Sequence, residues 1–77
     1  MKTFTCELKS LPGASDFWLC CHVWYEDGFV YRVEDELGRE HAFSTLSPFN
    51  REIVEKHLIL NLTADLSAVR TTYDLLQ

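Results

Sequence analysis

The sequence predicts an α+β fold, in which a small four-stranded antiparallel sheet (a β-meander) is followed by two C-terminal helices packed on one face. Three observations predict it. Apolar and polar residues alternate over residues 3–8, and residues 16–44 form three runs of strand-forming residues separated by two turns that contain Gly. After Ser44 the apolar spacing becomes helical. Because 77 residues suffice for one small core, we expect a single domain over residues 1–77.

The first strand is predicted over residues 3–8. Phe4, Cys6 and Leu8 alternate there with polar side chains, which is typical of a strand with one buried face. Residues 10–15 contain a Pro and a Gly and are predicted to be a loop. We expect the first strand to pair with its neighbour in sequence, residues 17–25.

The second strand ends at the turn of residues 26–28, where two geometries compete. A two-residue turn shifts the pairing by one residue and brings Arg32 to the apolar face. A three-residue loop keeps Arg32 on the other face and is therefore predicted. It implies two cross-strand pairs, Tyr25 with Phe29 and Val23 with Tyr31. It gathers apolar side chains of both strands on one face: Phe17, Leu19, Cys21, Val23, Tyr25, Phe29, Tyr31 and Val33.

A second three-residue loop is predicted at residues 36–38, which contain the next Gly. It leads into a short run at residues 41–43 and adds His41 and Phe43 to the same apolar face. The two hairpins then agree with each other, which supports both.

Two helices complete the predicted fold. Ser47 is the predicted N-cap of the first, with Pro48 at the first helical position and Asn50 as a competing cap. Thr63 is the predicted N-cap of the second, and residues 58–62 have strand as their alternative. The apolar positions at helical spacing are Phe49, Ile53, Val54, His57 and Leu58, then Leu66, Val69, Tyr73 and Leu76. Those expected to cover the sheet are Ile53, Leu58, Leu66, Val69 and Tyr73.

Composition and charge restrict the class of partner. Twelve acidic residues against seven basic ones give a net charge of −5, so direct binding to nucleic acid or to an anionic membrane is disfavoured. An acidic surface favours a protein partner with a basic surface instead. The three cysteines are an odd number and two are adjacent, which fits a reduced, cytoplasmic setting.

Cysteine and histidine chemistry is the main alternative function. Cys20 and His22 share a predicted strand face, and His41 lies on a neighbouring strand. However, the C-x₂₋₄-C pair typical of zinc sites is absent, and Arg32 beside His22 would repel a cation. No Gly-rich phosphate loop or nucleophile motif occurs either. We therefore expect no metal, no cofactor and no catalytic site, with a small metal-binding or enzymatic protein as the alternative.

The predicted working surface is the second face of the sheet together with the turns. Two tryptophans are unusual on a sheet face that is exposed to solvent, but they are typical of a surface that contacts another molecule. The predicted partner-binding residues on this face are Trp18, His22, Trp24 and Arg32. Acidic residues near the turns, predicted to steer a basic partner, are Glu26, Asp27, Glu34, Asp35, Glu36 and Glu40.

The sequence thus favours a cytoplasmic, non-enzymatic protein-binding module, with a homodimeric structural protein as a further alternative. In size, charge and α+β layout, though in no motif, the chain is similar to small inhibitors encoded by phages and mobile elements, including anti-CRISPR proteins. That resemblance implies direct binding to a host effector, in some cases by placing acidic groups where nucleic acid would lie. It rests on analogy of form.

Overall fold

The computed structural model describes the backbone of residues 1–76 and the side chains of residues 1–65. It confirms the α+β class and the four-stranded antiparallel sheet, whose strands follow one another in the order β1-β2-β3-β4. The elements in chain order are β1 (Lys2–Lys9), β2 (Trp18–Glu26), β3 (Phe29–Asp35), β4 (Glu40–His41), the 3₁₀ turn η1 (Phe43–Thr45) and α1 (Pro48–Leu76).

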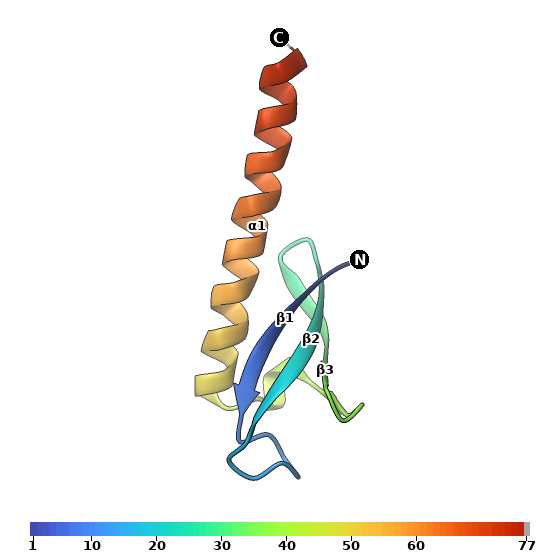
Figure 1. Ribbon diagram of the computed structural model, residues 1–77, viewed down its shortest axis with the longest axis vertical. Coiled ribbons are helices and arrows are strands. Elements are labelled where there is room, and N and C mark those ends of the chain that lie inside the picture. The colour runs from blue at the N-terminus through green and yellow to red at the C-terminus, as the bar shows by residue number, and fades with distance from the viewer. Residues whose placement is uncertain (77) are drawn as a thin grey trace.

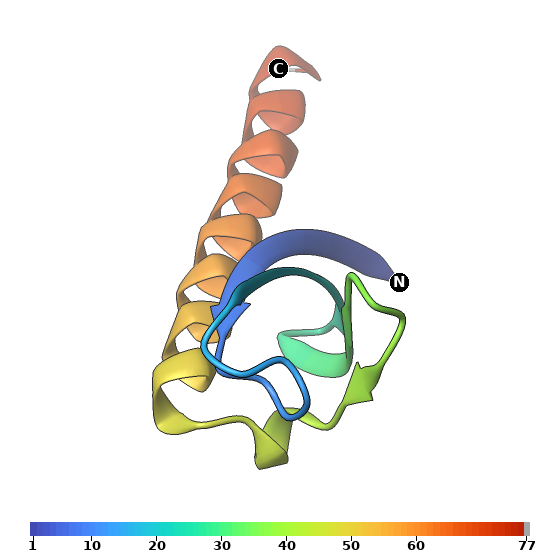
Figure 2. The same cartoon turned by 60° about the horizontal axis from the view of Figure 1, so that its bottom comes forward.

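The sheet curls around the core, as Figure 2 shows from one end. Strand β1 pairs with β2 along its full length, with Cys6 opposite Cys21 and Leu8 opposite Leu19, as the alternation predicted. Every second residue of each strand faces inward. The buried hydrophobic residues are Phe4, Cys6, Leu8, Leu11, Ala14, Leu19, Cys21, Val23, Tyr25, Val33, Leu46, Val54 and Leu58.

The β2–β3 hairpin differs from the prediction. Glu26 pairs with Phe29, so the turn has two residues, and both Asp27 (φ 53°) and Gly28 (φ 79°) adopt the left-handed conformation that such turns require. Beyond the turn, Tyr31 has no partner, and this bulge shifts the register. The two-residue turn is therefore compatible with an apolar inner face, because the bulge returns the later residues of β3 to the correct side.

The bulge also decides which aromatic side chains are buried. Trp24 pairs with Arg32 and Val23 with Val33, whereas the predicted pairs of Tyr25 with Phe29 and of Val23 with Tyr31 were wrong. Three aromatic residues predicted for the apolar face are exposed: Phe17, Phe29 and Tyr31. Phe17 is exposed because β2 begins one residue later, at Trp18.

The β3–β4 hairpin confirms the three-residue loop at residues 36–38. Val33 pairs with His41 and Glu34 with Glu40, and Gly38 takes the left-handed conformation. Strand β4 is shorter than predicted, because the chain bends into η1 after Ala42. Phe43 nevertheless packs partly buried against the core, as predicted.

The prediction of two C-terminal helices was wrong, since residues 48–76 form one α-helix. Thr63, the predicted cap of a second helix, lies inside it, and residues 58–62 are helical, not strand. No Gly or Pro interrupts the sequence between Phe49 and Leu76, so nothing in the backbone ends the first helix at Leu58. The side chains of Leu66, Val69, Tyr73 and Leu76 lie outside the described residues.

The start of α1 is fixed as predicted by Ser47, whose Oγ accepts a hydrogen bond from the backbone N–H of Asn50 at 3.2 Å. Asn50, the competing N-cap candidate, instead bonds to the backbone of β1. Its buried amide accepts from the N–H of Lys9 (3.1 Å) and donates to the carbonyl of Lys9 (2.7 Å). The helix thereby satisfies the backbone at the end of the edge strand β1.

Helix α1 packs along β1 and then continues past the sheet (Figure 1). Val54 and Leu58 are buried in the core, Ile53 packs partly buried against it, and the His57 ring stacks on Phe4 at 6.1 Å between centroids. Of the helix residues predicted to cover the sheet, Ile53 and Leu58 are thus confirmed. The molecule is elongated, with dimensions of 53 × 20 × 18 Å.

Candidate functional site

The outer face of the sheet carries most of the residues predicted to bind a partner. These side chains belong to the alternate positions of β2, β3 and β4 that face away from the core: Trp18, His22, Trp24, Arg32, Glu34 and Glu40. All are exposed except Trp24 and Glu34, which are half-buried. The structure divides them into two clusters at opposite ends of β2.

The first cluster surrounds Trp24. The guanidinium of Arg32 lies 4.8 Å from the Trp24 ring centroid, and the His22 ring lies 5.2 Å away on the same strand. Arg32 also forms ion pairs with Glu34 and with Glu40, the latter at 3.4 Å. Each exposed ion pair stabilises by at most about 1 kcal/mol, and the cation–π contact adds a similar amount. Trp24 is thus covered by an arginine whose charge is already balanced.

The second cluster lies at the start of β2, where Trp18 contacts the first turn of α1. Its ring centroid is 6.1 Å from that of Phe49, and the ammonium of Lys9 lies 5.9 Å from the same ring. Trp18 remains 49% exposed and Phe49 55% exposed. Trp18 and Trp24 are six positions apart on an extended strand, a separation of about 20 Å. Arg32, predicted for the same face, contacts Trp24 and does not reach Trp18.

A shallow groove of about 510 Å³ begins at Trp18 and runs between the sheet and α1. Its lining combines residues of β1 and β2, most of them on the outer face, with the near side of the helix: Thr5, Cys6, Glu7, Trp18, Cys20, Ile53 and His57. The sequence did not indicate that Ile53 lines this groove or that Phe49 contacts Trp18 at its end. Both were assigned to the buried side of a helix, because helical spacing cannot tell a core stripe from the rim of a groove.

The acidic residues near the turns do not form one surface. Glu26, Asp27 and Glu36 are exposed, as predicted. Asp35 is 3% exposed and therefore does not belong to the predicted surface. Its carboxylate accepts hydrogen bonds from the backbone N–H groups of Leu37 (2.9 Å) and Arg39 (3.0 Å). Its second oxygen lies 3.1 Å from Nε of Arg39 and 2.7 Å from Nε2 of His41.

Burial alone would raise the pKa of Asp35, yet its partners reverse the direction. The hydrogen bond with His41, the two backbone N–H groups and the charge of Arg39 lower the pKa to about 2. Asp35 is therefore ionised at neutral pH and holds the β3–β4 turn. Its sequence signal was available, since Asp35, Leu37, Arg39 and His41 surround one tight turn, but an acidic cluster in sequence does not show which carboxylate turns inward.

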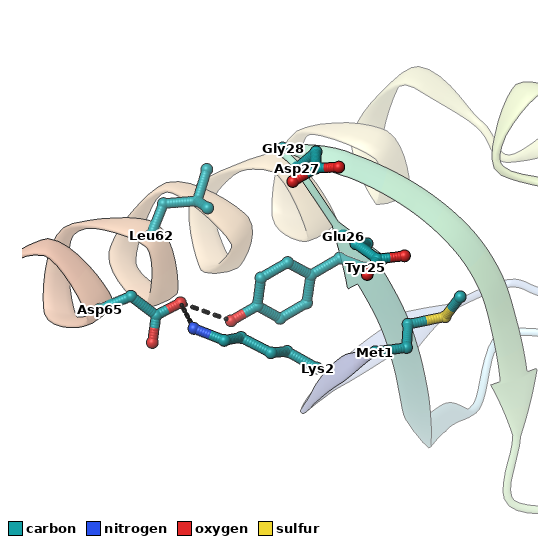
Figure 3. Close-up of a pocket in the computed structure, with 8 residues that line it drawn as sticks. All are labelled: Met1, Lys2, Tyr25, Glu26, Asp27, Gly28, Leu62 and Asp65. Carbon is teal, nitrogen blue, oxygen red and sulfur yellow. Dashed lines mark hydrogen bonds and ion pairs between the residues drawn. The ribbon is translucent and has the colours of Figure 1, made fainter.

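A second cavity, of about 630 Å³, lies where α1 leaves the sheet (Figure 3). The Tyr25 hydroxyl donates to Asp65 at 3.2 Å, and the Lys2 ammonium lies 2.9 Å from the same carboxylate. These bonds connect the N-terminal strand, the hairpin and the helix. Leu62 from α1 and Met1 give the cavity an apolar lining beside these polar groups.

The cysteines of the described region are free thiols. Burial raises the pKa of Cys6 to about 11 and that of Cys21 to about 12, so neither is an activated nucleophile. Cys20 is exposed in the groove. Within residues described by the structure, no three His, Cys, Asp or Glu side chains come together as metal ligands.

Along its described length, α1 lacks a stretch apolar enough to cross a lipid bilayer. Comparison of the chain with protein-family models, with curated proteins and with solved structures gives no significant match.

Proposed function

We propose that this chain is a non-enzymatic protein-binding module that presents the Trp18 end of its outer sheet face to a partner. One observation carries the proposal: Trp18 and Phe49 come from different elements, contact each other and each stay about half exposed. Tryptophan and large aromatic side chains at the mouth of a groove are typical binding anchors. Their fixed position keeps the entropy cost of binding low.

The proposed partner has a basic surface and an apolar side chain that enters the groove. The net charge of −5 favours a cationic partner, and Glu7 lies in the groove itself. Trp18 and Ile53 supply apolar walls for the inserted side chain. Arg32 contributes little to the net field, because Glu34 and Glu40 neutralise it.

In its narrower form the proposal is an inhibitor acting in the cytoplasm, of the kind that phages and mobile elements encode. The acidic surface would then occupy the nucleic-acid site of a basic host protein. What supports this is the acidic charge, the small size and the raised pKa values of the buried Cys6 and Cys21 thiols, which make these two poor nucleophiles.

The test is affinity capture from a host lysate, followed by affinity measurement with the captured protein. Trp18→Ala and Phe49→Ala should each weaken binding by about 2 kcal/mol or more, the scale of an interface hot spot. Phe29→Ala is the matched control, because Phe29 is also exposed (69%) but lies on the far hairpin. Nucleic acid should compete with the chain if the narrower form holds.

The proposal fails if Phe29→Ala weakens binding as much as Trp18→Ala, or if folded Trp18→Ala and Phe49→Ala variants bind as tightly as the parent. Charge-reversal variants provide a second test of the proposal. Glu26→Lys combined with Glu36→Lys should slow association, and high salt should have the same effect on the parent chain.

A further inference from the structure

Helix α1 is longer than the sheet that supports it, and Figure 1 shows its C-terminal part continuing beyond the strands. The last described side-chain bonds between helix and sheet are those of Asp65 with Tyr25 and Lys2. Eleven further residues, 66–76, continue the same helix. In soluble proteins helices gain most of their stability from packing of an apolar face.

The sequence of this helix carries an apolar repeat that starts at the exposed Ile59 and continues to Leu76, past the sheet. Its members alternate in spacing between three and four residues: Ile59, Leu62, Leu66, Val69, Tyr73 and Leu76. This is the a/d pattern of a heptad repeat, with an average spacing of 3.5 residues, and it predicts packing against another helix in a left-handed coiled coil. A helix that packs only on a sheet does not require this spacing.

The described start of the repeat is open to a partner. Ile59 is 62% exposed, whereas Leu62, at the wall of the cavity in Figure 3, packs partly buried against the core of its own chain. The cavity marks the place where the repeat leaves the sheet, and within the described structure no second helix of this chain covers it. A facing helix could therefore begin its contact here.

We infer that the α1 repeat is a self-association surface and that its partner is the α1 helix of a second copy of this chain. A second copy carries the same repeat, so the contact is self-complementary, as in a two-fold symmetric dimer. The charges beside the repeat agree. In this register Asp65 occupies a g position and Arg70 the following e position, which face each other between parallel helices. Asp65 already pairs with Lys2 of its own chain at 2.9 Å, so Arg70 of the second copy brings a further positive charge to the same carboxylate.

The dimer does not depend on the proposed partner-binding face, because Trp18 begins β2 and Phe49 lies in the first turn of α1, whereas the repeat lies in the later turns of that helix. The repeat covers 18 residues, or about 27 Å of helix. A coiled coil of this length is short, so we expect a reversible monomer–dimer equilibrium and not a permanent dimer.

The test is sedimentation equilibrium of the full chain over a range of concentrations, with two neighbouring substitutions. Ile59→Glu places a charge in the repeat, whereas Leu60→Glu places the same charge at an equally exposed position (65%) outside it. Ile59→Glu should raise the dimer dissociation constant at least tenfold, and Leu60→Glu should leave it nearly unchanged. Val69→Glu, further along the repeat, should act like Ile59→Glu.

The inference is overturned if the parent chain sediments as a monomer at every concentration, if it forms larger assemblies only, or if Leu60→Glu disrupts the dimer as much as Ile59→Glu. Circular dichroism and tryptophan fluorescence confirm that each variant is folded. Trp18→Ala should leave the dimer intact, and Ile59→Glu should still capture the protein partner, so failure of one proposal does not imply failure of the other.

Discussion

The role of a single residue in this chain depends on the face of the sheet on which its side chain lies. Asp35 is the clearest case. It stands between two glutamates in a stretch that reads as a solvated acidic turn, yet the pairing of Asp35 with Arg39 turns its carboxylate inward. Glu34 and Glu36 remain outside because neighbouring residues point to opposite faces. The sequence shows the charge but not its direction, which depends on the register of the hairpin.

Asp35 should make stability depend on acid pH. The folded protein holds its pKa at about 2, below the ordinary value of 3.8. The unfolded chain therefore binds the proton more readily, and the free energy of unfolding should fall as the pH drops from about 4 towards 2. Asp35→Asn should lose about 2–4 kcal/mol at neutral pH and should remove this acid-dependent part. Urea titrations at several pH values measure both effects; an unchanged pH dependence in Asp35→Asn would contradict the assignment.

The three thiols should differ in reactivity, because they lie on different faces of the sheet. In the folded chain iodoacetamide should label Cys20 and spare Cys6 and Cys21, whose raised pKa values leave little thiolate. After unfolding without reductant, mass spectrometry should find all three labelled. A folded Cys20→Ser variant should take up almost no label, and rapid labelling of Cys21 in it would show that the inner face is more accessible than described.

At the scale of elements, the sequence predicted the existence and order of the strands correctly and failed at their irregularities. Asp27-Gly28 is a strong signal for a two-residue turn. A regular ladder from that turn would bury Arg32, and the apolar pattern therefore favours a three-residue loop. One extra residue in β3, Tyr31, removes the conflict. Bulges leave no pattern in a single sequence, so turn chemistry and apolar pattern can disagree where both are correct.

The bulge makes Tyr31 dispensable. Deleting Tyr31 joins Val30 directly to Arg32, which keeps Trp24 opposite Arg32 and Val23 opposite Val33 in a regular ladder. The deletion should therefore cost less than about 2 kcal/mol, within the range of an ordinary substitution. Deleting His22 is the control, since β2 has no spare residue there and Cys21 would move to the outer face. Chemical denaturation compares the two; equal loss of the cooperative transition would show that the bulge itself is required.

The prediction of two helices was wrong for a different reason: a local signal for a helix start was present, but the fold does not use it. Thr63 followed by Asp65 resembles a helix start, but Thr63 is also tolerated inside a helix when no breaker precedes it. Whether such a signal starts a helix depends on whether the chain must turn back to bury an apolar face. Here the chain continues straight, which separates Ile53 and Leu58 under the sheet from the repeat that extends past it.

At the scale of the whole molecule, the α+β class, the strand order and most of the outer face could be predicted, because alternation in strands is a local property. The contact between the outer sheet face and α1 could not be predicted. Trp18 and Phe49 meet only because of the path that the chain takes between β4 and the helix. The same holds for Asn50, which serves β1 from 41 residues away. The candidate site therefore combines residues visible in the sequence with partners that only the fold supplies.

The described core closes before the end of the helix, and this leads to a prediction for the whole chain. The last buried side chain is Leu58, Leu62 packs partly buried against the core, and the last described bonds to the sheet are those of Asp65. A chain truncated after Asp65 should therefore unfold cooperatively at a midpoint close to that of the full chain, when both are dilute. At higher concentration the midpoint of the full chain should rise, because a dimer that forms only in the folded state stabilises it by mass action. The truncated chain should show no such rise. Thermal unfolding over a wide range of concentrations measures the difference. If the truncated chain fails to unfold cooperatively, residues beyond 65 belong to the core of their own domain, as the sequence first suggested for Leu66. If both chains show the same concentration dependence, association lies elsewhere than the α1 repeat.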